Sequence, residues 1–473
     1  MRRAALALSA ACAATLVVPA AASAHGLGGI TNLPVPGWLF LVGGGTVLVV
    51  SFIALGVLWQ EPRLGAPGDG RPFPRMLRAV LGSRALAIAL QALGVALFLL
   101  VWTAAAFGPE RVILNLAPTF VYVVFWVGMT VLVVCVGNVW VAVDPWRAVG
   151  DGVAGGARRL GLRRRPRSYP ARFGVWPAWG LLLGFITLEL VYKDPADPRM
   201  LAIAIAVYSA VTWSGTIVYG REAWRRNGDG FALYFELLSR IALLGSRDRD
   251  GRRELILRRP LSALTFVDRR PGALAFVALM LGSVAFDGFS RSSWWQNRIF
   301  DIRSAIADPE RADLVVMAVN FALLMLSIAI IATAYGIAVH AAQRIAGPGA
   351  DLRGVFLGSL VPIAFVYAFA HYLTYLLVQG QFALPRLSDP YGRGWDLLGA
   401  ADFQPKLDVL SPNQTWYTQV IALVIGHVVA LVVAHDRAVA LVSPAQRAMR
   451  TQYAMLALMV LYTVGGMWLL SLT

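Results

Sequence analysis

Five polar residues stand inside or beside long apolar segments of the sequence: His371, His427, Asp287, Glu189 and Asn320. An ionisable side chain in hydrocarbon costs roughly 2.5–3.5 kcal/mol on insertion scales, so each one needs a partner or a function. Neutral imidazole and carboxylate are the usual ligands of zinc and related divalent metals. A bound metal ion makes water a nucleophile near neutral pH. These residue types therefore predict a hydrolytic metal site or, alternatively, hydrogen bonds between helices.

His371 belongs to a stripe of polar residues. Tyr367, His371, Thr374, Tyr375 and Gln379 recur at spacings of three and four, so a helix places them on one face. On a helix surrounded by lipid, such a stripe would expose polar groups to hydrocarbon at a cost in free energy. We therefore expect this face to contact protein or water.

The roles predicted for these residues follow from their chemistry. We predict His371 and His427 as ligands of a divalent metal ion such as zinc. Asp287 and Glu189 are the predicted catalytic carboxylates, acting as a further ligand or as the general base. Asn320, Tyr367 and Tyr375 are predicted to line the same polar site.

The composition identifies the elements that must position this site. Of the 473 residues, 58% are hydrophobic and 14% are charged. A soluble domain carries roughly a quarter charged residues, and this apolar excess cannot be buried in one water-soluble core. Most of it forms runs of about 20 residues, which is the length needed to cross a bilayer as a helix. The predicted fold is an all-α polytopic bundle of transmembrane helices.

Ten spans follow an N-terminal signal peptide in this prediction. Residues 1–24 carry an arginine pair, an apolar core and an A-x-A cleavage motif at Ala22-Ser23-Ala24. Residues 25–473 then form a single membrane domain. The predicted spans cover residues 37–59, 79–106, 118–143, 175–192, 200–219, 271–288, 312–340, 354–378, 416–435 and 453–472.

The distribution of arginine predicts the orientation. Cleavage after residue 24 leaves the mature N-terminus outside, and ten spans place the C-terminus outside too. The arginine-rich stretches 158–172 and 221–270 then lie in the cytoplasm, as the positive-inside rule requires. The net charge of +16 is thus an orientation signal that meets anionic lipids of a bacterial cytoplasmic membrane, and not a sign of nucleic-acid binding.

This orientation places the candidate residues in the outer half of the bilayer. His371 lies ~10 Å and His427 ~16 Å from the outer ends of their spans, at 1.5 Å of rise per residue. His435 lies ~12 Å further along the helix than His427, so we expect His435 and Asp436 to end that helix in water at the cytoplasmic surface. His340 is expected at the same surface.

Three connecting segments are long enough to carry structure. The apolar stretch that begins at Phe231 is too short to span, and we expect an interfacial helix. Segment 289–311 carries Trp294-Trp295, which is typical of an aromatic belt at headgroup level. Segment 379–415 is rich in glycine and proline and is expected to be an irregular lid or binding loop.

Several stretches resemble a family of bacterial membrane proteins commonly named fenitrothion hydrolase. They are His25-Gly-Leu-Gly-Gly, Leu33-Pro-Val-Pro, Gly137-Asn-Val-Trp, Asp144-Pro-Trp-Arg, the Phe231 segment, Phe286-Asp-Gly-Phe-Ser-Arg, and Gly426-His427 through His435-Asp436-Arg437. The resemblance runs along most of the mature chain and implies a polytopic membrane fold. It also implies hydrolysis of a lipophilic phosphate or phosphorothioate triester at the bond to the aryl leaving group.

Two functions remain open on the sequence. In the first, a metal-activated water near His371 and His427 attacks a triester that arrives from the bilayer. In the second, the same residues form the pathway of a transporter or permease for a small solute, a proton or a metal ion. The sequence shows no internal repeat and few polar residues in the inner half of the spans. Both observations argue against the second function.

Overall fold

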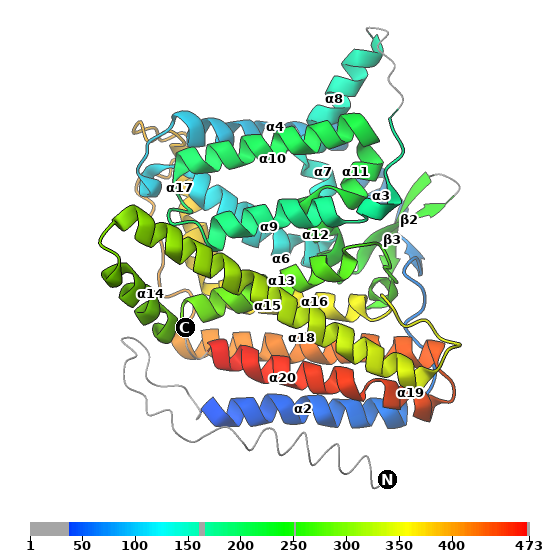
Figure 1. The fold of residues 1–473 in the computed structure, drawn as a ribbon. Helices are drawn as coiled ribbons and strands as arrows, with labels where there is room; N and C mark the ends of the chain where they lie inside the picture. Colours follow the sequence, from blue (N-terminus) through cyan, green and yellow to red (C-terminus); the bar gives the residue numbers. More distant parts are fainter. Residues whose placement is uncertain (1–36, 160–165, 250–251, 471–473) are drawn as a thin grey trace.

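The computed structural model describes residues 37–159, 166–249 and 252–470, and they form a bundle of long helices (Figure 1). Eight helical segments of this part of the chain are long and apolar enough to cross a membrane. They contain α4 (Arg84–Phe107), η2 (Thr119–Gly128) with α6 (Met129–Val136), α9 (Trp176–Leu190), α10 (Pro198–Tyr219), α13 (Ala273–Ser290), α15 (Pro309–Ala346), α16 (Leu357–Gln379) and α18 (Pro412–Leu441). The all-α polytopic fold is thereby confirmed.

Two further apolar helices occupy the first and last predicted spans. They are α2 (Gly37–Leu58) and α20 (Tyr453–Leu470), which pack against each other. Their apolar stretches, Val42–Leu58 and Tyr453–Trp468, are shorter than the eight others. Ten spans therefore stay a prediction, and the predicted signal peptide, residues 1–24, lies outside the described residues.

Short elements connect the long helices. The helical ones are α3 (Arg75–Leu81), η1 (Val112–Leu114), α5 (Leu116–Pro118), α7 (Trp140–Val143), α8 (Pro145–Arg159), η3 (Ala171–Phe173), α11 (Arg221–Asn227), α12 (Gly230–Leu238), η4 (Ser262–Thr265), α14 (Ser293–Ala305), η5 (Gly380–Phe382), α17 (Ala383–Ser388) and α19 (Ala445–Thr451). A three-stranded antiparallel sheet, in the order β1–β3–β2, was not expected from the sequence. Its strands are β1 (Gly70–Pro72), β2 (Leu244–Arg249) and β3 (Arg252–Arg258). It lies at one end of the bundle, which we call the arginine-rich end (Figure 1).

Helices α13 and α16 lie at the centre of the bundle. Most residues of α13 are buried, and α13 packs against α15 and α16. At Gly282 an added Cβ would come within 2.9 Å of the backbone of Ile328, so only glycine permits this approach of α13 to α15. Ser327 donates a hydrogen bond of 2.9 Å to the carbonyl of Gly282 at the same place. The centre of the bundle is therefore held by close backbone packing.

The expected interfacial helix is instead an internal one. Nearly every residue of α12 is buried, including Phe231, Tyr234 and Phe235. The Phe231 ring meets Trp146 at 6.2 Å and Phe185 at 5.1 Å between centroids. Apart from Glu236, which pairs with Arg225 and Arg240, the side chains of α12 are apolar. Such a helix finds more contact inside the bundle than at a membrane surface, where one face must be in water.

The two segments expected to be loops are partly helical. Segment 289–311 contains α14, and its two tryptophans differ in exposure. The side chain of Trp294 is 59% exposed, whereas that of Trp295 is 7% exposed. Trp295 is thus a core residue and not part of an aromatic belt. Segment 379–415 begins with η5 and α17 and packs on the bundle, where Tyr391 and Thr103 share a hydrogen bond of 2.8 Å.

His435 and Asp436 are buried, contrary to the expectation that they end their helix in water. They are 1% and 0% exposed. Helix α18 continues to Leu441, and the chain after α2 packs across it. Trp59 donates its indole N–H to Asp436 Oδ1 at 3.1 Å, and its carbonyl oxygen lies 2.9 Å from Nε2 of His435. These residues therefore join α2 to α18. His340 is exposed, as expected.

Candidate functional site

Asp287 is the centre of a buried polar cluster near the C-terminal ends of α9, α13 and α16. Its Oδ2 lies 2.7 Å from Nε2 of His371 and accepts a hydrogen bond of 2.9 Å from the hydroxyl of Tyr372. Its Oδ1 accepts a hydrogen bond of 2.8 Å from Nε of Arg291. We call Glu189, Asp287, Arg291, His371 and Tyr372 the Asp287 cluster. His371 and Asp287, which were predicted as a metal ligand and a catalytic carboxylate of one site, therefore meet across two central helices.

The hydrogen-bond pattern assigns the tautomer of His371. Because the carboxylate of Asp287 accepts, Nε2 of His371 carries the hydrogen in this contact. Within the described ranges, no hydrogen bond reaches Nδ1 of His371. A ring whose single hydrogen lies on Nε2 has its lone pair on Nδ1, which is the arrangement of a general base that a carboxylate orients.

The cluster extends to Glu189 through Tyr372. The hydroxyl of Tyr372 lies 3.3 Å from Oε1 of Glu189. A hydroxyl has one hydrogen, and the shorter contact directs it to Asp287. The same hydroxyl can turn to donate to Oε1 of Glu189 instead. Glu189, Tyr372, Asp287 and His371 thereby form a continuous chain of hydrogen-bonding groups.

A small cavity lies beside this chain. It measures about 20 Å³ and is lined by Glu189, Tyr372, Thr130, Tyr234 and Ser283 among apolar residues. A water molecule needs a cavity of roughly 10–15 Å³ with several polar partners. The cavity is therefore large and polar enough for about one water molecule.

The cluster reaches the end of the bundle opposite the arginine-rich end. The side chain of His371 is 9% exposed, whereas that of Arg291 is 60% exposed. Tyr375 is 38% exposed, and its ring lies 6.3 Å from that of Tyr372. An anion that approaches from this end meets Arg291 and Tyr375 before His371.

The structure places His427 in a different cluster. His427 is fully buried, and its Nδ1 lies 2.8 Å from the carbonyl oxygen of Leu423. Its ring packs edge-on against Tyr367, at 5.9 Å between centroids. The hydroxyl of Tyr367 donates to the carbonyl of Tyr462 at 2.5 Å. Tyr367 therefore packs α16 against α18 and α20, and it does not line the Asp287 cluster.

Asn320 is also apart from the Asp287 cluster. Its Oδ1 accepts a hydrogen bond of 3.0 Å from the indole of Trp295. Of the predicted residues, Glu189, Asp287 and His371 are joined by hydrogen bonds, and Tyr375 stands beside them. In the described part of the chain, no three His, Cys, Asp or Glu side chains gather closely enough to hold a metal ion. The metal ion at His371 and His427 stays a prediction, and no step below depends on it.

Sequence reasoning missed two residues of the cluster. Arg291 lies four positions after Asp287, and this spacing is a usable signal for an ion pair on one helix face. Tyr372 follows His371 directly and falls outside the polar stripe, so periodicity gives no signal for it. It reaches the carboxylates because they come from two other helices, α9 and α13.

Comparison of the chain with family models, with curated proteins and with solved structures finds no match.

A second pair of buried carboxyl groups lies outside the spans. Asp144 and Asp229 are each 3% exposed and accept hydrogen bonds from the first turns of α8 and α12, from the N–H groups of Arg147 and Ala232. Tyr208 also donates its hydroxyl to Asp229 at 2.7 Å. Burial, and then the charge of Asp229, raise the pKa of Asp144 above its usual range. Burial likewise raises the pKa of Asp229.

These raised pKa values predict how stability depends on pH. Above the ordinary aspartate pKa of about 3.9, the folded chain holds protons that the unfolded chain has released, so stability falls as pH rises. We expect the thermal midpoint in detergent to fall between pH 5 and pH 8. The substitution Asp144→Asn keeps the acceptor oxygen and removes the charge, so it should flatten this slope. Asp402→Asn, at an exposed position, is the matched control. An unchanged slope in Asp144→Asn would contradict the assignment.

Proposed function

We propose that the protein is an integral membrane hydrolase that cleaves lipophilic phosphate or phosphorothioate triesters, with His371 as the general base. The observation that carries the proposal is the contact of 2.7 Å between Nε2 of His371 and Asp287. A buried carboxylate that fixes one nitrogen of an imidazole leaves the other nitrogen ready to take a proton from water. The substrate class rests on the resemblance to proteins named fenitrothion hydrolase.

The reaction can be written with the residues of the cluster. Nδ1 of His371 takes a proton from a water molecule while the water oxygen forms a bond to phosphorus. The bond between phosphorus and the aryl oxygen breaks, and the aryl oxide leaves with the electron pair. Asp287 stabilises the imidazolium that forms. Arg291 donates to Asp287 from Nε, and its exposed terminal nitrogens can stabilise charge on the phosphoryl oxygen or sulfur.

The location of the cluster suits a lipophilic substrate. The cluster lies near the ends of three helices that are apolar enough to cross a bilayer. A triester dissolved in the membrane can therefore approach from lipid while its leaving group departs into water. With the predicted orientation, this end of the bundle faces outward from a bacterial cytoplasmic membrane, and both termini lie outside the cytoplasm.

The test uses the full chain reconstituted in lipid vesicles with an aryl phosphotriester. We expect repeated turnover, measured as release of the phenol. In water labelled with ¹⁸O, the label should enter the phosphorus product and not the phenol. Release no faster than in vesicles without protein would reject the hydrolase.

One observation favours a second function, which is proton-coupled transport. The chain from Glu189 through Tyr372 and Asp287 to His371 joins groups that can exchange a proton, and a cavity for about one water adjoins it. Buried ionisable residues of this kind occur in the proton pathways of transporters.

The substitution Glu189→Gln distinguishes the two functions. It removes the exchangeable carboxyl proton and leaves the contact of His371 with Asp287. Under transport, a pH-sensitive dye inside the vesicles should report proton uptake by the wild type and none by this variant. Thr187→Val, two residues before Glu189 on α9, is the control. Hydrolysis by Glu189→Gln without any proton flux in the wild type would reject transport.

A further inference from the structure

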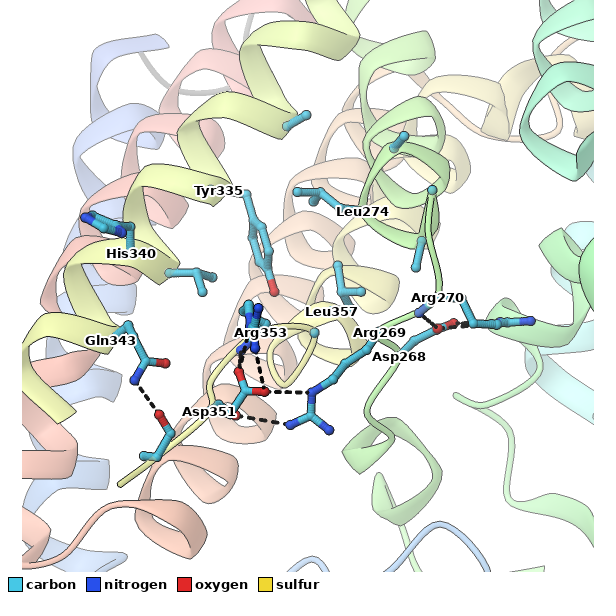
Figure 2. Close-up of a pocket in the computed structure, with 18 of the residues that line it drawn as sticks. Asp268, Arg269, Arg270, Leu274, Tyr335, His340, Gln343, Asp351, Arg353 and Leu357 are labelled. Atoms are coloured by element: carbon cyan, nitrogen blue, oxygen red, sulfur yellow. Dashed lines mark hydrogen bonds and ion pairs between the residues drawn. The ribbon is translucent and has the colours of Figure 1, made fainter. Parts of the chain in front are cut away.

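We propose that a cleft at the arginine-rich end, between α13 and α15, binds an anionic phospholipid. The cleft, drawn in Figure 2, has a volume of about 830 Å³, and none of the residues that line it belongs to the Asp287 cluster. It is apolar along the helices and charged at one end. This combination fits a molecule with hydrocarbon chains and a negatively charged headgroup.

The apolar part of the cleft combines small side chains with larger ones such as Leu274 and Leu357. Ala273 and Ala275 line it from α13, and Ala332 and Gly336 line it from α15. A Cβ added to Gly336 would meet nothing within 4 Å, so the space beside it is open. At the rim, Trp176 is 47% exposed, as is usual for an aromatic side chain at a membrane interface. This open, largely apolar space is suited to acyl chains.

The charged part carries more positive than negative charge. Asp351 receives two guanidinium groups, Arg269 at 3.3 Å and Arg353 at 3.0 Å. Arg270 is paired separately with Asp268 at 2.6 Å. One carboxylate balances only one of the two arginines on Asp351, so one positive charge remains there. The side chains of Arg269 and Arg353 are 52% and 82% exposed, and both can turn toward a phosphate group.

The segment that carries Asp351 and Arg353 is held in place before any ligand binds. Gln343, on the last turns of α15, donates to the carbonyl oxygens of Gly347 and Ala350 and accepts from the N–H of Leu352 at 2.9 Å. Figure 2 shows the hydroxyl of Tyr335 pointing toward the pair of Asp351 and Arg353. A fixed segment loses little conformational entropy on binding.

The position of the cleft distinguishes a lipid from a soluble anion. The apolar lining residues come mostly from the start of α13 and the last turns of α15, and the charged ones come from the segments that adjoin these ends of membrane-crossing helices. Helix ends lie at headgroup depth, and the apolar walls therefore extend into the hydrocarbon. Basic pockets between helices on the cytoplasmic side bind anionic headgroups in this way. Free phosphate would contact the charged end of the cleft only and would make no contact with the apolar walls.

The test measures lipid retained by the full-length protein in native mass spectrometry. The probes are phosphatidylglycerol, which is anionic, and phosphatidylcholine, which is zwitterionic. For the wild type we expect preferential retention of phosphatidylglycerol. The double variant Arg269→Gln, Arg353→Gln should lose this preference by roughly tenfold, because each arginine near an anionic lipid contributes to binding. Gly336→Leu fills the open space and should reduce retention of both lipids.

Arg447→Gln, an exposed arginine at the same end and outside the cleft, is the matched control and should retain phosphatidylglycerol. The thermal midpoint of each variant without added lipid shows that it is folded. Three results would overturn the proposal: undiminished preference in the double variant, equal loss in Arg447→Gln, or displacement of the lipid by millimolar inorganic phosphate. The last result would assign the site to a soluble anion.

Discussion

Replacement of His371 by alanine is expected to lower the rate of triester hydrolysis by about 10²–10⁴-fold, which is the usual contribution of a general base. His371 is positioned by Asp287 at 2.7 Å, and in the described residues no other imidazole contacts this carboxylate. Asp287→Asn should cause a loss of similar size, because an amide cannot hold the same tautomer or stabilise the imidazolium. The measurement is the steady-state release of phenol in reconstituted vesicles.

The control for this prediction is His340→Ala. His340 is exposed at the arginine-rich end and should be dispensable for hydrolysis. Thermal midpoints in detergent must show that all three variants are folded. If His371→Ala keeps more than about a tenth of the wild-type rate, the ring is not the base.

Replacement of Asp436 by alanine is expected to destabilise the protein by roughly 3–5 kcal/mol, the range for breaking a buried charge pair. Asp436 is fully buried and accepts from four donors. Two are the side chains of Trp59 at 3.1 Å and Arg437 at 2.6 Å, and two are the backbone N–H groups of Arg63 at 2.5 Å and Leu64 at 3.1 Å. Alanine leaves all four without this acceptor and removes the link between α18 and the chain that follows α2.

The free energy of unfolding, measured by denaturant titration in mixed micelles, checks this prediction. Asp436→Asn keeps one acceptor oxygen and should cost less than the alanine variant. Asp408→Ala, at an exposed position, should change stability by no more than about 0.5 kcal/mol. An equally small effect of Asp436→Ala would show that the buried contacts do not hold α2 in place.

The long apolar segments were predictable because their length and composition follow from the thickness of a bilayer. The same reasoning was wrong for the Phe231 segment, since apolarity predicts burial without saying whether lipid or protein provides it. It also missed the small sheet, whose strand β1 pairs with β3 from a distant part of the sequence, as Arg78 of α3 pairs with Glu254 of β3. For Trp295, the partner Asn320 lies on another helix, and a single sequence does not show that contact.

The depth of the site residues along their helices was predictable from the sequence. The rotation of each helix about its own axis was not. Periodicity and rise per residue brought Asp287, Glu189 and His371 to one end of the bundle, and the structure joins them. His427 lies on a neighbouring helix, yet its ring contacts Tyr367 and not Asp287. How far a helix is rotated about its axis is decided by packing, here by the contacts of Tyr367 with α20, and hydropathy does not report it.

Chemical rescue of His371→Ala is the most direct test of the proposed hydrolase. The measurement is the hydrolysis rate of this variant in vesicles as imidazole is added, beside Asp287→Asn and vesicles without protein. If His371 supplies the base, imidazole should restore the rate of His371→Ala in a saturable way and leave the other two samples unchanged. An undiminished rate without imidazole, or an equal rise in all three samples, would contradict the account.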